Sequence, residues 1–330
     1  MPHTDLPLDL LRDYRPDVAE PADFDEFWTT TLAEARALST APVLDAVAGP
    51  FTEVAITDLT FAGFGGDPVR AWITRPHADE PRPAVIEFLG YNGGRGLPGE
   101  RLHWANAGYV HVLMDTRGQG SGWGSGGDTA DPHGSGPAFA GFLTRGIENP
   151  QSYFYRRVFT DAVLLADVVS ALPFVDAGRI AVTGGSQGGG ISLAAAALSP
   201  AVRAVLPDVP FLCHFRRSAE LTPSAPFTEL REYLGVHRGA EERVFTTLSY
   251  FDGVNFARRI RAAALFSVAL MDEVVLPSSV FAAFNHCAAA DREIAVYAFN
   301  GHEGGELHHW YRQHAWLGER FRPEPAQASR

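Results

Sequence analysis

The chain has 330 residues, of which 46% are hydrophobic and 20% charged, so most of it can bury a core and disorder is excluded for the bulk. Its net charge of −12 provides no basic surface for phosphate backbones or anionic membranes, so neither nucleic acid nor a membrane is an expected partner. All 27 basic residues are arginines, and the lack of lysine excludes P-loop, Schiff-base and Ser-Lys chemistry.

The N-terminal part predicts a helix followed by a hairpin. Residues 1–17 lack the basic start and apolar run of a secretory signal, and no later stretch is long and apolar enough to span a membrane, so we expect a cytoplasmic protein. Residues 24–38 carry apolar side chains at helical spacing behind an acidic start. Residues 51–61 and 69–75 are rich in β-formers and flank the turn sequence GFGGDP. We therefore expect a helical extension over residues 1–45 and then an antiparallel sheet edge.

After Pro83 the pattern changes to short continuous apolar runs separated by helix-length segments. Such runs are typical of strands buried on both faces, and the intervening helices indicate parallel crossovers. The expected strands are 84–89, 109–115, 180–184, 204–209, 264–271 and 293–299, and the expected crossover helices are 98–107, 153–172, 187–198, 277–289 and 307–320. The sequence predicts one α/β domain over residues 1–330, with a mostly parallel central sheet flanked by helices and a helical insertion at about 211–259.

A candidate nucleophile lies between a predicted strand and a predicted helix. Gly184 and Gly188 bracket Ser186 in the sequence GGSQG, directly after an apolar strand and directly before a small-residue helix. A sharp strand-to-helix turn needs small neighbours, because the serine backbone is strained and crowded. This context favours a nucleophile elbow over an ordinary glycine-rich turn.

A serine nucleophile needs a histidine base and a carboxylate that orients the base. In α/β-hydrolases these partners follow the serine in the order acid, then histidine. Asp272 follows one predicted strand and His302 follows the next, and the carboxyl ends of parallel strands are where such sheets bind ligands. We therefore expect Asp272 and His302 to complete the site, with Glu273 as the alternative acid because it also follows the strand.

Acyl transfer also needs backbone donors for the developing oxyanion. One is expected from Gln187, the residue after the serine. The second is expected from the glycine-rich loop over residues 88–94, where Tyr91 is the preferred donor and Asn92 the competing one.

No cofactor or metal is expected. The stretch that begins at His302-Glu303 carries Glu306 where the HExxH zinc motif needs a second histidine. Cys213 and Cys287 are too far apart in sequence for a zinc motif, and two cysteines make no disulfide framework. We therefore expect both cysteines to be buried in the core as small hydrophobic residues.

Several motifs together resemble one family. They are YNGGRG, RGQG, YRRVFTDAV, GGSQGGG, PFLCHFRR and GHEGG, and they run through most of the chain. This combination closely resembles the acetyl xylan esterase and cephalosporin C deacetylase group, carbohydrate esterase family 7. The resemblance implies a catalytic triad of Ser186, Asp272 and His302, with backbone oxyanion donors at Tyr91 and Gln187.

The resemblance also implies an α/β-hydrolase fold, no metal, and deacetylation of short acetylated sugars and of cephalosporins through an acetyl-serine. It implies a homo-oligomer as well, a ring-like hexamer. Arg117, Gly118 and Gln119 match a family motif that we interpret as structural, because arginine's planar fork suits buried pairing that holds a loop. One departure is Leu89, which stands where members usually carry histidine.

Three rival hypotheses remain. A peptidase or amidase of the prolyl-oligopeptidase type shares the elbow and the order of the triad, but the chain has neither propeller repeats nor an evident acidic pair for a peptide amine. A carboxylesterase of different acyl specificity would also fit, and the insertion over residues 220–244 would set that specificity. A non-catalytic binding protein is the third, but such proteins usually lack part of the triad.

Overall fold

A single nine-stranded sheet forms the centre of the computed structural model, which describes residues 5–134 and 136–322. The strand order is β1-β2-β3-β5-β4-β6-β7-β8-β9. The strands from β4 to β9 pair in parallel, whereas β1, β2 and β3 form an antiparallel edge. The bounds are β1 Val43–Ala46, β2 Val54–Ala62, β3 Pro68–Pro76, β4 Arg82–Phe88, β5 Val110–Met114, β6 Val175–Gly185, β7 Ala204–Asp208, β8 Ala263–Ala269 and β9 Arg292–Tyr297.

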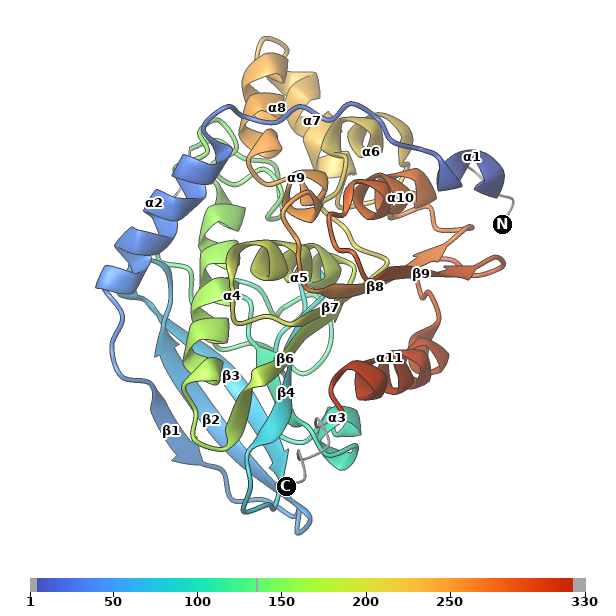
Figure 1. Cartoon of the computed structure of the whole chain (residues 1–330). Coiled ribbons are helices and arrows are strands. Elements are labelled where there is room, and N and C mark those ends of the chain that lie inside the picture. The colour runs from blue at the N-terminus through green and yellow to red at the C-terminus, as the bar shows by residue number, and fades with distance from the viewer. Residues whose placement is uncertain (1–4, 135, 323–330) are drawn as a thin grey trace.

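Helices cover both faces of this sheet (Figure 1). The helices α4, α5 and α10 lie on one face, and α3 and α11 lie on the other (Figure 1). The bounds are α1 Leu8–Arg12, α2 Phe24–Ala37, α3 His103–Asn106, α4 Phe154–Ser170, α5 Gln187–Leu198, α6 Phe215–Leu221, α7 Thr228–Val236, α8 Glu241–Ser249, α9 Gly253–Ala257, α10 Pro277–His286 and α11 Glu306–Arg320.

The side chains of the continuous apolar runs are buried in two cores, because successive residues of a strand point to opposite faces of the sheet. In β4, Ala84 and Ile86 belong to the large core beneath α4 and α5, whereas Val85 belongs to a smaller core with Trp104 of α3 and Trp316 of α11. This double burial confirms the mostly parallel sheet flanked by helices that the sequence predicts.

Two local predictions are wrong. The helix expected over residues 98–107 is present only as α3, because Gly99 has a φ of +89°, a left-handed value that a regular helix does not contain. The helical extension expected over residues 1–45 ends in a strand, since β1 pairs with β2. All four residues of β1 are exposed, so its sequence VLDA shows no alternation of apolar and polar side chains that would mark a strand. Residues 1–4 of that extension lie outside the described residues.

The insertion between β7 and β8 contains α6, α7, α8 and α9, within the residues for which the sequence predicts helices. In Figure 1, α6, α7 and α8 lie at the top of the molecule, away from β1 and β2. The assignment of the whole chain to one domain stays a prediction.

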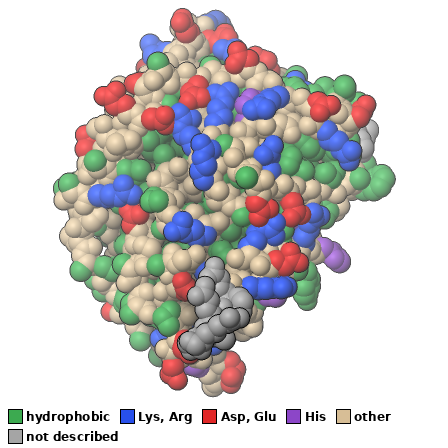
Figure 2. All heavy atoms as spheres, viewed as in Figure 1, with side chains coloured by type: hydrophobic (Ala, Val, Ile, Leu, Met, Phe, Trp, Pro, Cys, Tyr) green, Lys and Arg blue, Asp and Glu red, His purple; other side chains and the backbone are tan. Residues whose placement is uncertain are grey.

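Surface charge and the length of the apolar helices are the two features that concern contact with a membrane. Arginine and carboxylate side chains lie interspersed on the face in Figure 2 rather than gathered by sign. Across residues 5–134 and 136–322, no helix is both long and apolar enough to cross a bilayer.

Candidate active site

Ser186 lies at the sharp turn between β6 and α5. Its backbone adopts φ 55° and ψ −117°, a conformation that is strained for a residue with a side chain. The turn is held by two hydrogen bonds, from Ser186 N–H to the carbonyl of Asp208 at 2.9 Å and from Phe211 N–H to the carbonyl of Ser186 at 2.9 Å. A Cβ at position 188 would lie 2.1 Å from the carbonyl oxygen of Phe88, so only glycine lets α5 approach β4 this closely.

The three side chains expected to act together lie in one chain of contacts. Ser186 Oγ is 3.0 Å from His302 Nε2, and His302 Nδ1 is 2.8 Å from Asp272 Oδ2. The side chain of Asp272 is 1% exposed, and its Oδ1 accepts the N–H groups of Val274 at 2.8 Å and Val275 at 2.9 Å. These bonds fix the carboxylate, which in turn orients the imidazole toward the serine.

Glu273, the alternative acid, lies elsewhere. Its backbone carbonyl accepts the hydroxyl of Thr222, and the residue lines a separate cavity beside Asp5 and Arg217. Asp272, not Glu273, is therefore the acidic residue that contacts His302.

The loop after β4 holds both candidate backbone donors, Tyr91 and Asn92. Asn92 N–H is already bonded to Gln119 Oε1 at 2.9 Å, whereas the N–H of Tyr91 donates to no acceptor among the described residues. Gln187 is the first residue of α5, where a backbone N–H has no partner within the helix. The two N–H groups expected to bind an oxyanion are thus free to do so.

A network of neutral amides joins this loop to the elbow. Gln119 and Gln187 form a reciprocal pair of hydrogen bonds at 2.9 and 3.1 Å. Gln187 also donates to the carbonyl of Leu89 at 3.1 Å and accepts the hydroxyl of Tyr155 at 2.8 Å. Leu89, the departure from the family pattern, is buried and takes part in this network through its backbone.

Arg117 belongs to a different, charged cluster. It binds Asp161 through two bonds at 2.6 and 2.8 Å, and it reaches Asp67 at 2.9 Å and Asp131 at 3.4 Å. Burial by itself lowers the pKa of Arg117, but the three carboxylates raise it above its ordinary value, so the guanidinium stays charged. Gly118, between Arg117 and Gln119, has a φ of +68°, which favours glycine.

A cavity of about 590 Å³ opens over Ser186. It includes His302 and the Tyr91 loop, and it is also lined by Trp123 and Glu229, which the sequence analysis missed. Trp123 donates its indole N–H to the carbonyl of Tyr91 at 2.7 Å. Trp123 lies in a glycine-rich loop, and this was the only feature of the sequence that could have pointed to it as a cavity residue. Glu229 lies in the insertion, where sequence patterns do not predict how a helix is placed relative to the active site.

Glu229 ties the insertion to the loop after β4. The hydroxyl of Tyr91 donates to Glu229 Oε1 at 2.6 Å, and Leu143 N–H donates to Glu229 Oε2 at 3.0 Å. Burial and the neighbouring carboxylate raise the pKa of Tyr91, so its hydroxyl stays a donor. Burial also raises the pKa of Glu229, against the opposing effect of these hydrogen bonds. The pair therefore fixes the cavity wall without reaching the serine.

Side chains of the types that bind metal ions lie around this arrangement and in the rest of the described residues. Within the part of the chain that the structure describes, no group of three or more His, Cys, Asp or Glu residues is placed to hold a metal ion. Cys213 and Cys287 are both buried and unpaired. The chemistry that this geometry allows is transfer of an acyl group to a hydroxyl, with the imidazole moving the proton.

Comparisons with known proteins agree with this geometry. Solved acetyl xylan esterases from Paenibacillus sp. R4 and Thermoanaerobacterium sp. JW/SL YS485 are 37% and 35% identical, with TM-scores of 0.90 and 0.88. The first comparison covers 95% of this chain and 99% of that one, and the second covers 96% and 100%. The fold is therefore the α/β-hydrolase fold expected from the sequence.

A curated acetyl esterase of Xylanibacter ruminicola is 25% identical over 87% of this chain, which spans 65% of the length of that relative. The model of the acetyl xylan esterase family matches residues 1–320. The chain belongs to the acetyl xylan esterase family.

Proposed function

We propose that the protein is a serine esterase that removes acetyl groups from short acetylated xylo-oligosaccharides and from acetyl esters of the cephalosporin C type. The observation that carries this proposal is the contact chain from Ser186 through His302 to Asp272, beneath a cavity that also holds a free backbone N–H. Membership of the acetyl xylan esterase family supports acetyl as the acyl group and xylan as the source of the alcohol.

In the first half of the reaction, Ser186 Oγ attacks the acetyl carbonyl while His302 Nε2 takes its proton. Asp272 holds His302 through Nδ1, which keeps Nε2 directed at the serine and stabilises the imidazolium that forms. The N–H groups of Tyr91 and Gln187 bind the oxyanion of the tetrahedral intermediate. His302 then gives the proton to the departing sugar oxygen, and an acetyl-serine remains.

In the second half, His302 takes a proton from water, and the resulting hydroxide attacks the acetyl-serine carbonyl. The same two N–H groups bind the second oxyanion, and collapse returns the proton to Ser186 Oγ and releases acetate. Every proton is carried by one imidazole, so the cycle needs no metal or cofactor. Arg117, Gly118 and Gln119 contribute by holding their loop and have no direct part in bond making.

The test is acetate release from acetylated xylo-oligosaccharides and from cephalosporin C, measured side by side with Ser186→Ala as the blank. We expect kcat/KM above about 10⁴ M⁻¹s⁻¹ on both substrates, the low end of ordinary enzyme efficiency. Cleavage of aminoacyl amides without cleavage of either acetyl ester would refute the proposal in favour of a peptidase. Cleavage restricted to longer acyl esters would refute the acetyl specificity.

We also propose a homo-oligomer, a hexamer, for which the resemblance to the family is the support. Sedimentation equilibrium of the full chain tests it, and a monomer at micromolar concentration would contradict it. The cytoplasmic location expected from the sequence stays a prediction.

A further inference from the structure

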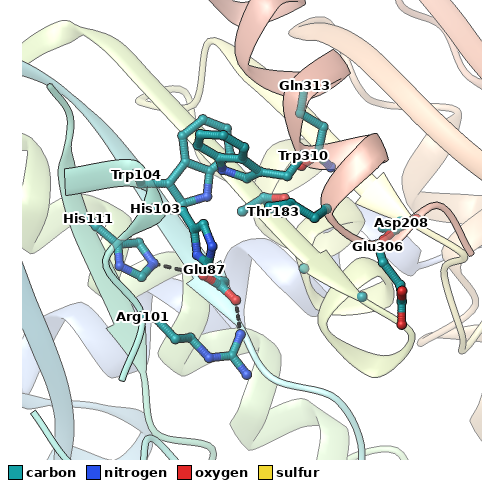
Figure 3. Close-up of a pocket in the computed structure, with 13 residues that line it drawn as sticks. Glu87, Arg101, His103, Trp104, His111, Thr183, Asp208, Glu306, Trp310 and Gln313 are labelled. Carbon is teal, nitrogen blue, oxygen red and sulfur yellow. Dashed lines mark hydrogen bonds and ion pairs between the residues drawn. The ribbon is translucent and has the colours of Figure 1, made fainter. Parts of the chain in front are cut away.

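A second cavity lies on the opposite side of the elbow from α5, between α3 and α11 (Figure 3). Its volume is about 410 Å³, within the range of about 300–1,000 Å³ that is usual for small-molecule sites. Figure 3 shows His103, Trp104 and Trp310 on one side of it and Asp208 and Glu306 on another. Nothing in the mechanism above uses this cavity.

The second cavity adjoins the first through the residues that hold the nucleophile. Gly185 and Asp208 line both cavities. Gly185 directly precedes Ser186, and the carbonyl of Asp208 accepts the N–H of Ser186 at 2.9 Å. The two cavities therefore lie beside the same strand-to-helix turn, so a sugar chain whose acetylated ring lies at Ser186 has the second cavity next to it.

An aromatic cluster forms one wall. The ring of Trp310 stacks on His314 with centroids 5.5 Å apart, and Trp104 and His103 each lie 5.5 Å from it. These contacts fix Trp310 as a rigid apolar surface. Its indole Nε1 is buried and has no hydrogen-bond partner, so what Trp310 offers a ligand is the apolar surface of its ring.

Both donors and acceptors are available around that wall. Arg101 and His111 bind Glu87 on the cavity floor, and although burial raises the pKa of Glu87, these two neighbours lower it to about 2. Among the described residues, the carboxylate of Glu306 has no partner, and Asp208 Oδ2 accepts no hydrogen bond although Oδ1 accepts the hydroxyl of Ser267. Glu306 also has a φ of +43°, a strained value at the first residue of α11.

This lining disfavours an anion, which offers only acceptors and would meet three carboxylates. A cation offers only donors, so it could use the unpartnered carboxylate oxygens of Asp208 and Glu306 but not the guanidinium of Arg101. A neutral sugar ring suits the lining better, because each hydroxyl both donates and accepts and the C–H face of the ring can lie on an indole.

We propose that the cavity between α3 and α11 is a glycosyl-binding subsite, which holds a neighbouring xylopyranose ring while the acetylated sugar lies at Ser186. The inference rests on the proposed function for the identity of the sugar, but its binding energy comes from residues outside the triad. It predicts that chain length of the substrate affects KM through Trp310 and Glu306.

The first experiment measures binding without turnover. Unacetylated xylotriose is titrated calorimetrically into the Ser186→Ala protein, and into versions that also carry Trp310→Ala, Glu306→Ala or Tyr311→Ala. We expect about fivefold to tenfold weaker binding for Trp310→Ala and at least about threefold weaker binding for Glu306→Ala. Tyr311→Ala is the matched control, because this neighbouring aromatic residue is 63% exposed and does not line the cavity.

The second experiment compares two esters with the single variants. Trp310→Ala and Glu306→Ala should raise KM for acetylated xylotriose by the same factors and leave kcat/KM for p-nitrophenyl acetate unchanged, because that ester has no second sugar. Glu306 is exposed and unpaired, so its variant tests the subsite even if Trp310→Ala fails to fold.

The outcomes separate the two proposals. If wild type does not release acetate from acetylated xylotriose but the Ser186→Ala protein binds xylotriose through Trp310, the proposed function fails and the subsite stands. If wild type deacetylates acetylated xylotriose but neither variant changes binding or KM, the subsite is refuted and the function stands. Displacement of xylotriose binding by choline chloride, or binding of choline alone, would overturn the assignment to a neutral sugar.

Discussion

Arg117 and Gln119 lie two residues apart, yet Arg117 holds its loop through charges and Gln119 through neutral amides. Arg117 reaches away from the cavity to Asp161 of α4 and to Asp67 beside β3. Gln119 reaches toward the cavity, to Gln187 beside the nucleophile and to the N–H of Asn92. Strong ion pairs thus hold the loop on the side away from the cavity, while neutral amides position the backbone of the Tyr91 loop and of Gln187.

This difference has an electrostatic reason. The reaction develops a negative charge on the oxyanion and a positive charge on His302, and a buried charge nearby would favour one and oppose the other. Neutral amides fix the backbone of Gln187 and of the Tyr91 loop without that bias. We therefore expect changes in the charged cluster to affect stability and changes in the amide network to affect catalysis.

The largest expected loss of kcat comes from the nucleophile, which belongs to neither network, and the losses expected for the two networks are compared with it. Ser186→Ala should lower kcat by about 10⁶-fold, as when the nucleophile of another serine hydrolase is removed. Acetate release measures the loss, and urea unfolding should give a wild-type midpoint. Activity above a hundredth of wild type would contradict the role of Ser186 and with it the comparison.

Arg117→Met tests the charged cluster. The buried carboxylate of Asp161 would lose its counter-charge, and we expect a loss of about 3–5 kcal/mol in the free energy of unfolding. The matched control is Arg36→Met, which breaks an exposed arginine–aspartate pair and should cost less than about 1 kcal/mol. Urea unfolding measures both losses. Equal losses in the free energy of unfolding for the two variants would contradict the distinction between buried and exposed ion pairs.

Gln119→Glu places a charge in the neutral network. We expect kcat to fall by about 10²- to 10³-fold, comparable to the loss of one oxyanion donor, because the new carboxylate opposes the oxyanion and breaks the pairing with Gln187. The loss should grow as pH rises and the carboxyl ionises. A kcat equal to that of Gln119→Ala at every pH would show that neutrality of this residue is unimportant.

Gln119→Ala and Tyr155→Phe are milder changes to the same network. Gln119→Ala should lower kcat about tenfold, because the Tyr91 loop and the elbow lose their link while the backbone N–H groups remain. Tyr155→Phe removes one hydrogen bond to Gln187 and should cost about 1 kcal/mol of stability with a smaller effect on kcat. Steady-state kinetics on p-nitrophenyl acetate separates them, and a larger kcat loss for Tyr155→Phe would reverse the expected order.

The smallest expected effect is a pH dependence of stability that the two networks do not share. Burial raises the pKa of Asp67, but Arg117 and His133 lower it further, so the net pKa lies below the ordinary value of 3.8. The folded state then binds fewer protons than the unfolded state, and this stability is lost as pH falls below about 4.

Asp67→Asn should therefore lose less stability on acidification than wild type, measured as urea midpoints from about pH 5 to about pH 3. Gln119→Ala should follow the wild-type slope, because an amide does not titrate in this range. A flatter slope for Gln119→Ala than for Asp67→Asn would contradict the assignment of charge to one network only.

The sequence could predict where the three triad residues lie but could not choose between neighbouring candidates. Ser186, Asp272 and His302 stand at the ends of continuous apolar strands, so the pattern that predicts the sheet also predicts their positions. The choice between Asp272 and Glu273, or between Tyr91 and Asn92, depends on side-chain direction and hydrogen bonding, which the structure supplies.

Other parts left no pattern to detect. Glu229 lies in the helical insertion, whose packing is set by long-range contacts such as that with Tyr91. Trp123 lies in a glycine-rich loop, and β1 is exposed along its length. The second cavity draws on α3 and α11, two helices far apart in the sequence, so its lining could not be predicted from either helix alone.

The central claim is that Ser186 is the nucleophile and that His302 activates it. Titration with a p-nitrophenyl phosphonate ester, which reacts irreversibly with activated serines, tests this most directly when residual acetate release and the labelled peptide are measured on the same samples. We predict one label per chain on Ser186, loss of activity in proportion to labelling, and no labelling of His302→Ala. Full activity after complete labelling, or stoichiometric labelling of another residue with parallel loss of activity, would contradict the account.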